Sequence, residues 1–394
     1  MNNTFVTAFH ILNDSLEIAF KNYLLLKKNE IKEFEDIFFY SGLEFKLFNF
    51  YRINDIKVSQ NLKNITSFKS RRSLRNILEV KNIANLLAKN SVKHAFLKGV
   101  AFNLYNFTKI NERSFSDIDI LINEEDIDLV IQILLKAKYR FSNKYLVNRK
   151  KWVGSLDKNG DIGMYSPNNQ LIELHTKLIS KSDERSFRFK DKVLENTLCI
   201  NFGATNISII SHENYILHII SNYMEQSMLS SGIRYVYDII EINKNIKIDW
   251  DRLYLQSLKY SINRPFKLTV DICNYFKKDL LDYKDINLKI DKAILKDAIE
   301  LSFNNRYSAN YIEIVNNKRI SIIQSFLKFL KASSNEISYF FNIKNNIVNY
   351  CFFYPIYIIL RFLSIYDKVN KMKHYPVKQF QKVKLKNVLN YLNE

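Results

Sequence analysis

Apolar residues recur three or four positions apart along most of the chain, which predicts amphipathic helices. Up to about residue 88 this spacing is clear in the segment that holds Leu74, Ile77, Leu78 and Ile83. The same pattern returns after Ser211, which suits the start of a helix. The 394 residues include only 7 glycines and 4 prolines, so few positions interrupt a helix. We therefore expect a mainly helical protein.

The pattern changes between about residues 89 and 200. Here short apolar stretches alternate with turn signals, such as Lys-Asn-Gly-Asp at 158–161 and Ser-Pro-Asn-Asn at 166–169. This is the one segment that predicts strands together with helices. The expected organisation has four parts: a helical amino-terminal region at 1–88, an α/β core at 89–200, a helical domain at 201–320 and a helical tail rich in basic and aromatic residues at 321–394.

The tail combines an uncharged aromatic segment at 347–360 with a lysine-rich stretch that follows it. A membrane-spanning helix needs about 20 apolar residues, and this segment is interrupted by Asn349, Pro355 and Arg361. We expect it to pack on the helical domain. The alternative is peripheral contact of residues 345–394 with an anionic membrane, because aromatic and lysine side chains together suit that surface.

The formal net charge of +19 points to an anionic partner, such as a nucleotide, a nucleic acid or an acidic membrane. The excess is mostly lysine and accompanies abundant asparagine and isoleucine, a combination that biased nucleotide composition also produces. The three cysteines are far apart and form no CxxC pair, which argues against a zinc site or a disulfide framework. The amino terminus lacks the pattern of a secretory signal, so we expect a cytoplasmic protein.

The first candidate for chemistry is the turn at Lys98-Gly99. Residues 95–97 predict a short buried strand, Gly99 makes the turn, and a helix follows. A helix that begins in this way presents backbone N–H groups to an anion, and Lys98 adds a full charge. Many such turns bind nothing, so the signal is weak alone.

Asp117 and Asp119 form the second candidate. Residues two apart on a strand project from the same face, so both carboxylates point together while Ile118 and Ile120 point to the other side. Two like charges repel, which favours cations between them. Asn123 ends this strand, and we expect it to cap a helix at 124–137.

A third carboxylate is Glu173, which shares one face of a predicted strand with His175. Three carboxylates from two adjacent strands are what a two-metal site for phosphoryl transfer requires, with ions about 3.5–4 Å apart. The alternative is that Glu173 and His175 are ordinary solvent-facing strand residues. On a later helix, Arg234 and Asp238 are four residues apart and most simply pair with each other, although Arg234 reaching a nucleotide is the alternative.

The strings LKGVAFNLY, RSFSDIDILI and IELH resemble a family of uncharacterised nucleotidyltransferases in the DNA polymerase beta-like superfamily. In this family a Lys-Gly turn stands where better-known members have Gly-Ser. The resemblance continues through the segment 212–218, the Arg234 and Asp238 pair and Asp249-Trp250, and covers about residues 70 to 320. It implies an α+β fold with a small mixed-sheet core of the nucleotidyltransferase type, flanked by mainly helical regions on both sides.

The resemblance also implies transfer of a nucleoside monophosphate from an NTP, such as ATP, with Mg²⁺ or Mn²⁺ as cofactor. Asp117, Asp119 and Glu173 would be the catalytic metal ligands. The nucleotide-binding set comprises Lys98, Gly99, Asn103, Arg113 and His175. The acceptor is unidentified, and a small molecule or a sugar phosphate is favoured.

Two other functions remain open at this point. One is a non-catalytic scaffold or binding protein, peripheral to a membrane where surface polymers are made. The other is a toxin-like nucleotidyltransferase that acts on RNA, which the +19 charge motivates. RNA binding of that kind weakens steeply with salt. Because no RNA-recognition motif is present, nucleic acid is the less favoured partner.

Overall fold

The structure is a computed structural model. It describes residues 3–105, 113–142, 161–178, 184–226, 232–276, 290–303 and 379–393, with short pieces at 229, 280–282, 347–348, 351–357 and 359. The predicted turn at 158–161 and most of the predicted tail at 321–394 therefore lie outside the described residues.

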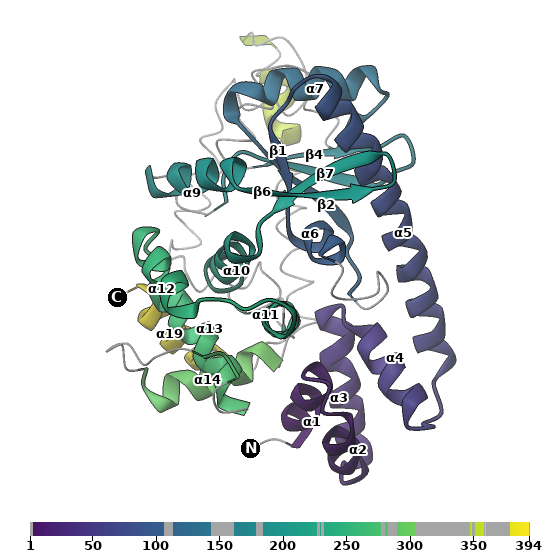
Figure 1. The fold of residues 1–394 in the computed structure, drawn as a ribbon, viewed down its shortest axis with the longest axis vertical. Coiled ribbons are helices and arrows are strands. Elements are labelled where there is room, and N and C mark those ends of the chain that lie inside the picture. Colours follow the sequence, from purple (N-terminus) through teal and green to yellow (C-terminus); the bar gives the residue numbers. More distant parts are fainter. Residues whose placement is uncertain are drawn as a thin grey trace.

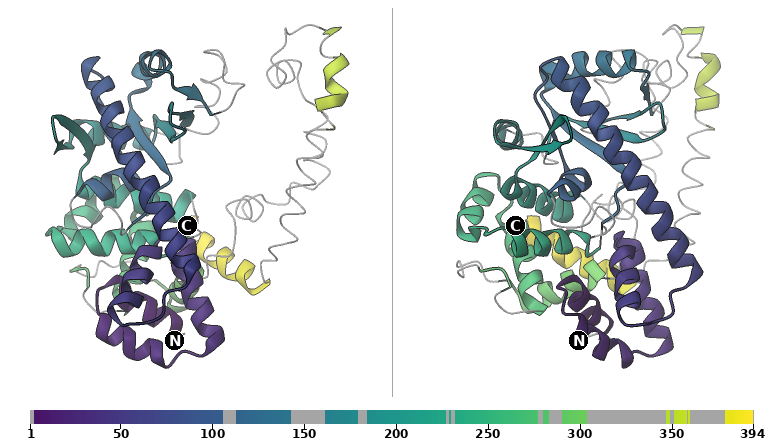
Figure 2. Two further views of the ribbon diagram at one scale, coloured as in Figure 1. Left: turned by 90° about the vertical axis from the view of Figure 1, so that its right-hand side faces the viewer. Right: turned by 45° about the vertical axis from the view of Figure 1, so that its right-hand side comes forward.

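Five helices form the amino-terminal part and confirm its predicted helical character. They are α1 (Asn3–Leu12), α2 (Leu16–Leu24), α3 (Lys28–Ser41), α4 (Glu44–Ile53) and α5 (Gln60–Lys89). Helix α5 has 30 residues and begins where the Ser59 side chain accepts a hydrogen bond from the Leu62 backbone N–H, as a good cap does. It runs along the side of the molecule from the first four helices to the sheet (Figures 1 and 2).

A seven-stranded mixed sheet forms the core, in the order β3-β4-β5-β2-β1-β7-β6. The strands are β1 (His94–Phe96), β2 (Asp117–Ile122), β3 (Arg140–Phe141), β4 (Asp161–Tyr165), β5 (Leu171–His175), β6 (Thr197–Phe202) and β7 (Thr205–Ile210). The α+β fold expected from the resemblance is confirmed. The sheet continues to Ile210, past the predicted boundary at residue 200.

The central strands β2 and β5 are parallel neighbours, and Asp119 lies opposite Glu173. On β2 the isoleucines Ile118 and Ile120 are fully buried, as the alternation predicts. Strand β1 pairs with β2 in the antiparallel sense, with Phe96 opposite Ile120. The two acidic strands are therefore adjacent in the sheet, although more than 45 residues of chain separate them.

Helices cover the sheet on both sides. In Figure 1, α7 (Ile127–Lys136) lies above it, and α6 (Lys98–Leu104) and α10 (His212–Ser221) lie below it. Helix α9 (Glu184–Glu195) contacts β1 and β2. Asn123 occupies the N-cap position as expected, but residues Glu124–Asp126 form a 3₁₀ turn first, and the Asn123 side chain makes no capping bond to the backbone. Its amide lies instead 3.5 Å from the Asp126 carboxylate.

The remaining described helices form a bundle beside the sheet. They are a short π-helix (Asn222–Gln226), α11 (Arg234–Asn245), α12 (Trp250–Lys259), α13 (Asn263–Phe276), α14 (Lys292–Phe303) and α19 (Gln379–Asn393). Helix α19 packs on α14, where Lys384 pairs with Glu300 and Asn387 donates to Asp297 at 3.0 Å. One continuous hydrophobic core joins this bundle to the sheet and to the amino-terminal helices.

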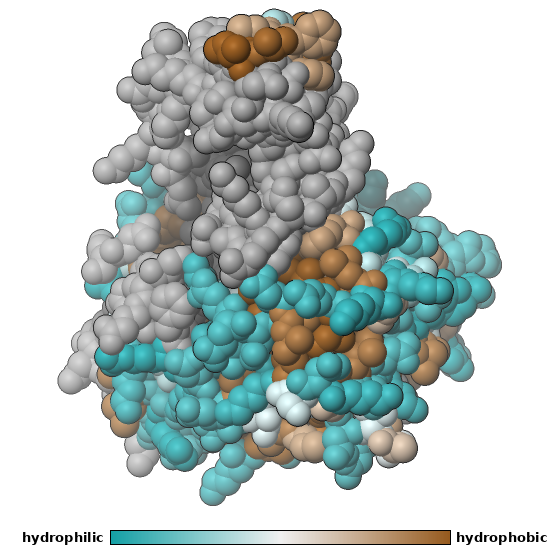
Figure 3. All heavy atoms as spheres, turned by 90° about the horizontal axis from the view of Figure 1, so that it is seen from above, coloured by the Kyte–Doolittle hydropathy of each residue, from teal (hydrophilic) through white to brown (hydrophobic). Residues whose placement is uncertain are grey.

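The surface holds several exposed apolar side chains. Seen from above, an apolar area lies among polar residues (Figure 3); α7, uppermost in Figure 1, exposes Leu129 and Leu135. In the predicted aromatic segment, Ile347 and Phe352 are 75% and 68% exposed, whereas Tyr357 is buried. Among the described residues, no helix combines the length and apolar character that crossing a membrane requires.

Candidate functional site

Asp119 is the centre of the candidate site. It projects from the middle of the sheet and is 1% exposed. The Lys98 ammonium donates to its Oδ1 atom at 2.7 Å, and His175 Nε2 lies 2.9 Å from the same oxygen. A buried carboxylate requires such partners, because burial without them costs several kcal/mol. Three elements, β2, β5 and the start of α6, thus supply one compact polar cluster.

Glu173 brings a second carboxylate to this cluster. It stands opposite Asp119 on the neighbouring strand, and its Oε2 atom lies 3.7 Å from His175 Nε2. One ligand atom each from Asp119, Glu173 and His175 fall within 4.8 Å of one another. Side chains this close can share one divalent ion. The sequence predicted that Glu173 and His175 share a face, and the parallel register then places that face beside Asp119.

The charges of the cluster act on one another. Burial alone would raise the pKa of Asp119, but the Lys98 ammonium and the His175 hydrogen bond outweigh burial and hold it well below its usual range. Burial, with the charge of Asp119, raises the pKa of Glu173 to about 7. The cluster therefore holds one firmly ionised carboxylate next to one that resists ionisation. An additional cation between them would favour the ionised form of both.

The Lys98-Gly99 turn differs from the prediction in one respect. Lys98 adopts the left-handed backbone conformation, with φ +42°, whereas the φ angle of Gly99 is not in the left-handed region. A lysine held there is strained, and such strain is typical of functional positions. Gly99 is required for a different reason: a Cβ atom there would overlap Phe115 and lie 2.8 Å from Arg113 Nη1. The turn packs directly against the chain that enters β2, and this contact brings Lys98 to Asp119.

Asn103 and Arg113, two of the predicted nucleotide-binding residues, lie behind this turn. Both are buried, 3% and 2% exposed. The Asn103 amide donates to the carbonyls of Gly99 and Arg113, at 2.7 and 3.1 Å. Arg113 Nε donates to Asp238 Oδ1 at 2.9 Å. In this arrangement the two side chains hold the turn in place, and their hydrogen bonds are made to the protein itself.

Asp117 stands apart from the three-residue cluster. It begins β2 and is half-buried, and its carboxylate accepts a hydrogen bond from Ser116 Oγ at 3.2 Å. Its strand partner is Leu171, whereas Glu173 is opposite Asp119. The predicted set Asp117, Asp119 and Glu173 is therefore not the most compact one in the described residues. His175, predicted to bind nucleotide, takes the place of Asp117 in that group.

His218 on α10 is a neighbour of the site that the sequence did not indicate. Its Nδ1 atom lies 3.2 Å from the Leu178 carbonyl oxygen, while its Nε2 atom is buried and has no hydrogen-bond partner among the residues that the structure describes. Burial, and then the charges of Lys98 and His175, lower its pKa to about 3, so the ring is neutral. The spacing of His212 and His218 along the helix gave no sign of this. Only the packing of α10 under the sheet brings His218 close.

The predicted pair of Arg234 and Asp238 is wrong. Asp238 is fully buried, and its carboxylate accepts from Arg113 Nε and, at 2.7 Å, from Tyr215 Oη. Arg234 Nε donates instead to the Ser41 carbonyl at 2.6 Å. An i, i+4 pair on a helix surface is worth a few tenths of a kcal/mol. A buried carboxylate gains more from partners that enclose it, and Arg113 and Tyr215 do so from two other elements.

The donor set of the cluster suits a divalent ion. Two carboxylates favour hard cations such as Mg²⁺ and Mn²⁺, and an imidazole ligand is better suited to a transition metal than to Mg²⁺. Lys98 and His175 both contact Asp119, and the Lys98 ammonium supplies positive charge there. The residues present therefore fit a metal site, and the imidazole favours Mn²⁺ of the two expected ions.

Comparison with known proteins adds one finding. The profile of a family described as uncharacterised nucleotidyltransferase matches residues 49–277, more than half of the chain. The match includes β1, β2 and β5, the start of α11 and every residue of the cluster around Asp119. No curated protein matches the sequence.

Proposed function

Because the chain belongs to the family of uncharacterised nucleotidyltransferases, we propose that it is a metal-dependent enzyme that transfers a nucleoside monophosphate from an NTP to an acceptor. The convergence of Asp119, Glu173 and His175 within 4.8 Å on two adjacent strands is the observation that carries the proposal. Transfer of this kind depends on positioning and on stabilising negative charge, and requires little covalent chemistry from the protein.

Asp119 and Glu173 would hold the metal, with His175 as a third ligand and Asp117 at the edge of the site. A divalent ion bound there would neutralise charge on the phosphates and activate the attacking oxygen. The firmly ionised Asp119 is suited to bind that ion. Lys98 carries a full positive charge beside Asp119. We propose that its ammonium binds the phosphates of the NTP, where it acts as a point charge.

The acceptor belongs to the proposal only as a class. A small molecule or a sugar phosphate remains the favoured acceptor, since the sequence contains no RNA-recognition motif. The net charge of +19 leaves RNA as the alternative acceptor. Salt distinguishes the two: binding to RNA weakens by orders of magnitude between about 50 and 200 mM salt, whereas transfer to a small acceptor does not.

Nucleotide binding is the first test. Calorimetry with each of the four NTPs, in Mn²⁺ and in Mg²⁺, should give metal-dependent binding to the wild type. Asp117→Asn and Asp119→Asn should weaken it, since each removes negative charge that holds the ion. The matched control is Glu125→Gln, which changes an exposed acid just beyond the other end of β2 and should bind as the wild type does.

Transfer is the second test. The protein, incubated with α-³²P-labelled NTP and a fraction of small molecules or RNA, should label an acceptor in a metal-dependent way, and Asp119→Asn should not. Equal labelling by the wild type and the variant would contradict the proposal. A wild type that binds no NTP in either metal would contradict it more directly and would favour a non-catalytic binding protein.

A further inference from the structure

Arg234 forms no ion pair with an acid among the described residues. It begins α11, and its guanidinium makes one hydrogen bond among the described residues, from Nε to the Ser41 carbonyl. Asp238, one helical turn later, is occupied by Arg113 and Tyr215. A guanidinium carries five N–H donors and remains protonated in proteins. Within the part of the chain that the structure describes, the four N–H groups of its two terminal nitrogens make no hydrogen bond, which leaves them for a ligand.

Contacts through Gly42 and Ser114 connect Arg234 to the chain that enters β2. Its Nη2 atom packs on Gly42, where a Cβ atom would come within 2.6 Å of it. The Gly42 carbonyl accepts a hydrogen bond from Ser114 Oγ at 3.2 Å. Ser114 lies three residues before Asp117, at the entrance to β2. The guanidinium is thus fixed beside the chain that carries the acidic residues.

A second chain of contacts leads to the Lys98 side of the site. Arg113, paired with Asp238 on α11, has its Nη1 atom against Gly99. Arg113 therefore links α11 to the Lys98-Gly99 turn. Both routes are made of hydrogen bonds and close packing, so Arg234 has a defined position relative to Asp117 and Lys98.

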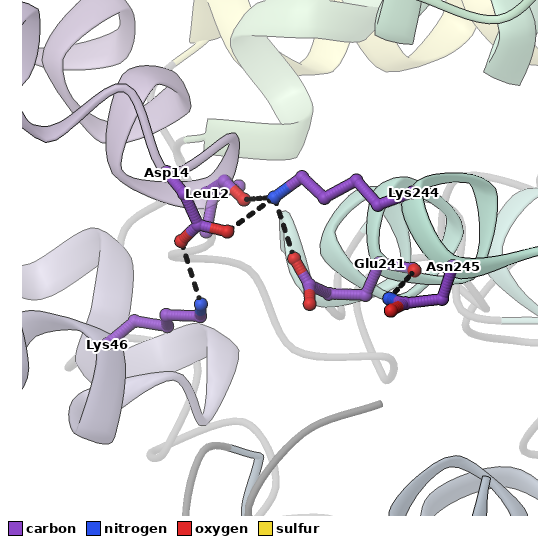
Figure 4. A network of polar contacts seen from close by, with 6 residues as sticks. All are labelled: Leu12, Asp14, Lys46, Glu241, Lys244 and Asn245. Atoms are coloured by element: carbon purple, nitrogen blue, oxygen red, sulfur yellow. Dashed lines mark hydrogen bonds and ion pairs between the residues drawn. The ribbon is translucent and has the colours of Figure 1, made fainter. Parts of the chain in front are cut away.

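Helix α11 is also held at its other end. Lys244 donates to the Leu12 carbonyl at 3.3 Å and pairs with Asp14 and Glu241 at 2.6 and 2.8 Å (Figure 4). Asp14 in turn pairs with Lys46 of α4 at 3.1 Å. The amino-terminal region thus contacts α11 at both ends: Ser41 bonds Arg234 at its start, and Asp14 pairs with Lys244 near its end. This arrangement orients Arg234 before any ligand arrives, which reduces the entropy that binding must overcome.

No carboxylate of the described residues is in ion-pair contact with Arg234. Burial and the nearby Arg113 lower the pKa of Arg234, and the more distant charges of Asp238 and Asp117 only partly oppose this effect. A partly buried cation of this kind is costly unless an anion joins it. The planar guanidinium suits a phosphate, which it can bind through two parallel hydrogen bonds.

We propose that Arg234 binds the terminal phosphates of the NTP, so that the amino-terminal helices, through Ser41 and Gly42, take part in substrate binding. The inference rests on the proposed function, because it requires an NTP at the Asp119 cluster. It assigns the triphosphate to the space between Lys98 and Arg234, which approach the acidic residues from two different elements. Arg234 is a binding residue in this scheme, and the metal ligands are unaffected by its loss.

Calorimetry with nucleotides of different phosphate number tests the proposal. The NTP of highest affinity among the four is compared with its diphosphate and monophosphate, all with Mn²⁺. Arg234→Gln should weaken triphosphate binding roughly 10- to 100-fold, the loss expected for charge-assisted hydrogen bonds to phosphate. The triphosphate affinity of Arg234→Lys should lie between those of the wild type and Arg234→Gln, since lysine keeps the charge but lacks the planar guanidinium. Binding of the monophosphate and of Mn²⁺ alone should not change.

The matched control is Arg264→Gln. Arg264 also bonds a backbone carbonyl, that of Tyr391, at 2.7 Å, but on the helical bundle. Its loss should leave all nucleotide affinities unchanged. If Arg234→Gln binds the triphosphate as tightly as this control, or loses monophosphate affinity to the same degree, the inference is wrong. A wild type that binds no NTP would instead refute the proposed function.

A measurement on the wild type covers the case in which the Arg234 variants do not fold. Inorganic tripolyphosphate with Mn²⁺ should protect Arg234 from modification by phenylglyoxal, as read by peptide mass spectrometry, while Arg264 reacts equally with and without it. Protection by tripolyphosphate but not by orthophosphate assigns the contact to a phosphate chain. Equal modification of Arg234 with and without tripolyphosphate would overturn the inference.

Discussion

Two buried aspartates, Asp119 in the sheet and Asp238 on α11, each hold a cation, yet their surroundings differ. The Asp238 carboxylate and the Arg113 guanidinium are 0% and 3% exposed. Asp119 is as deeply buried, but its partner Lys98 is 22% exposed, and a second carboxylate, Glu173, is 27% exposed beside it. The pair of Asp238 and Arg113 is therefore fully inside the core. The pair of Asp119 and Lys98 is partly accessible to solvent and has a second carboxylate beside it.

The difference separates a structural ion pair from a site that can do chemistry. Around Asp238, Tyr215 and Arg113 supply the donors found among the described residues, and the carboxylate is fully buried. Burial still raises the pKa of Asp238, whereas the cations lower that of Asp119. A crowded pair of carboxylates at an opening favours an added cation. Substitution of Asp119 should therefore mainly reduce activity, and substitution of Asp238 should mainly reduce the free energy of unfolding.

Asp119→Asn should give the largest effect, on activity. Loss of the central metal ligand should lower metal-dependent transfer at least about 10⁴-fold, about 5.4 kcal/mol in the barrier. The measurement is the rate of label transfer from α-³²P NTP. The loss in unfolding free energy should be smaller than for Asp238→Asn, because Lys98 is partly exposed and can reach water. Retained activity would remove Asp119 from the site.

Asp238→Asn should show the reverse profile. It leaves Arg113 buried without a counter-charge, which should lower the free energy of unfolding by about 3–5 kcal/mol. Urea denaturation followed by circular dichroism measures this loss. Tyr215→Phe is the matched control: it removes one hydrogen bond and should cost only about 1 kcal/mol. Equal losses in the two variants would mean that the ion pair is not what stabilises this part of the core.

Gly99→Ala tests how the two regions are joined, since Arg113 packs on the turn that carries Lys98. The added Cβ would overlap Phe115, and such overpacking costs about 1–3 kcal/mol. Gly203→Ala is the control, because its Cβ would meet only Lys81 Nζ at 3.9 Å. That variant should cost about 1 kcal/mol, from its positive φ alone. Thermal denaturation compares the two, and a smaller loss at Gly99 would contradict the tight packing.

The smallest expected effect is a change in the ratio of the affinities for Mn²⁺ and Mg²⁺. Thermal shift should show stabilisation by Mn²⁺, about 2.7 kcal/mol when the ion is at 100 times its dissociation constant. His175→Gln exchanges the imidazole for an amide and should weaken Mn²⁺ binding more than Mg²⁺ binding. The variant also keeps both carboxylates, so an ion should still bind. An unchanged ratio between the two ions would exclude His175 as a ligand.

Much of the candidate site could be predicted from local patterns. The alternation around Asp119 predicted a strand with its isoleucines inward, and the same period placed Glu173 and His175 on one face. What the period could not supply is the pairing of strands. Asp119 lies opposite Glu173 because β2 and β5 are parallel in that register, a long-range arrangement that no local spacing encodes. A shift by two residues would have brought Asp117 into the cluster.

The partners of charged side chains were predicted less well. Arg234 and Asp238 are close in sequence and suggested a pair, but the protein uses Arg113, 125 residues away from Asp238, in that role. Asn103 and Arg113, which we expected at the nucleotide, make hydrogen bonds within the fold, and their nucleotide-binding role stays a prediction. A local rule counts only neighbours on one helix, whereas a buried charge is satisfied by whichever donor the whole fold brings to it.

The amino-acid sequence by itself determined the periodic elements, the Lys-Gly turn and the faces of the acidic strands, because those depend on residues next to one another along the chain. The tertiary structure decided which carboxylates meet, which cations neutralise them and that Arg234 bonds the Ser41 carbonyl rather than Asp238. These depend on the parallel register of β2 with β5 and on the packing of α11 between the sheet and the amino-terminal helices. Burial makes such long-range contacts strong enough to override local preference.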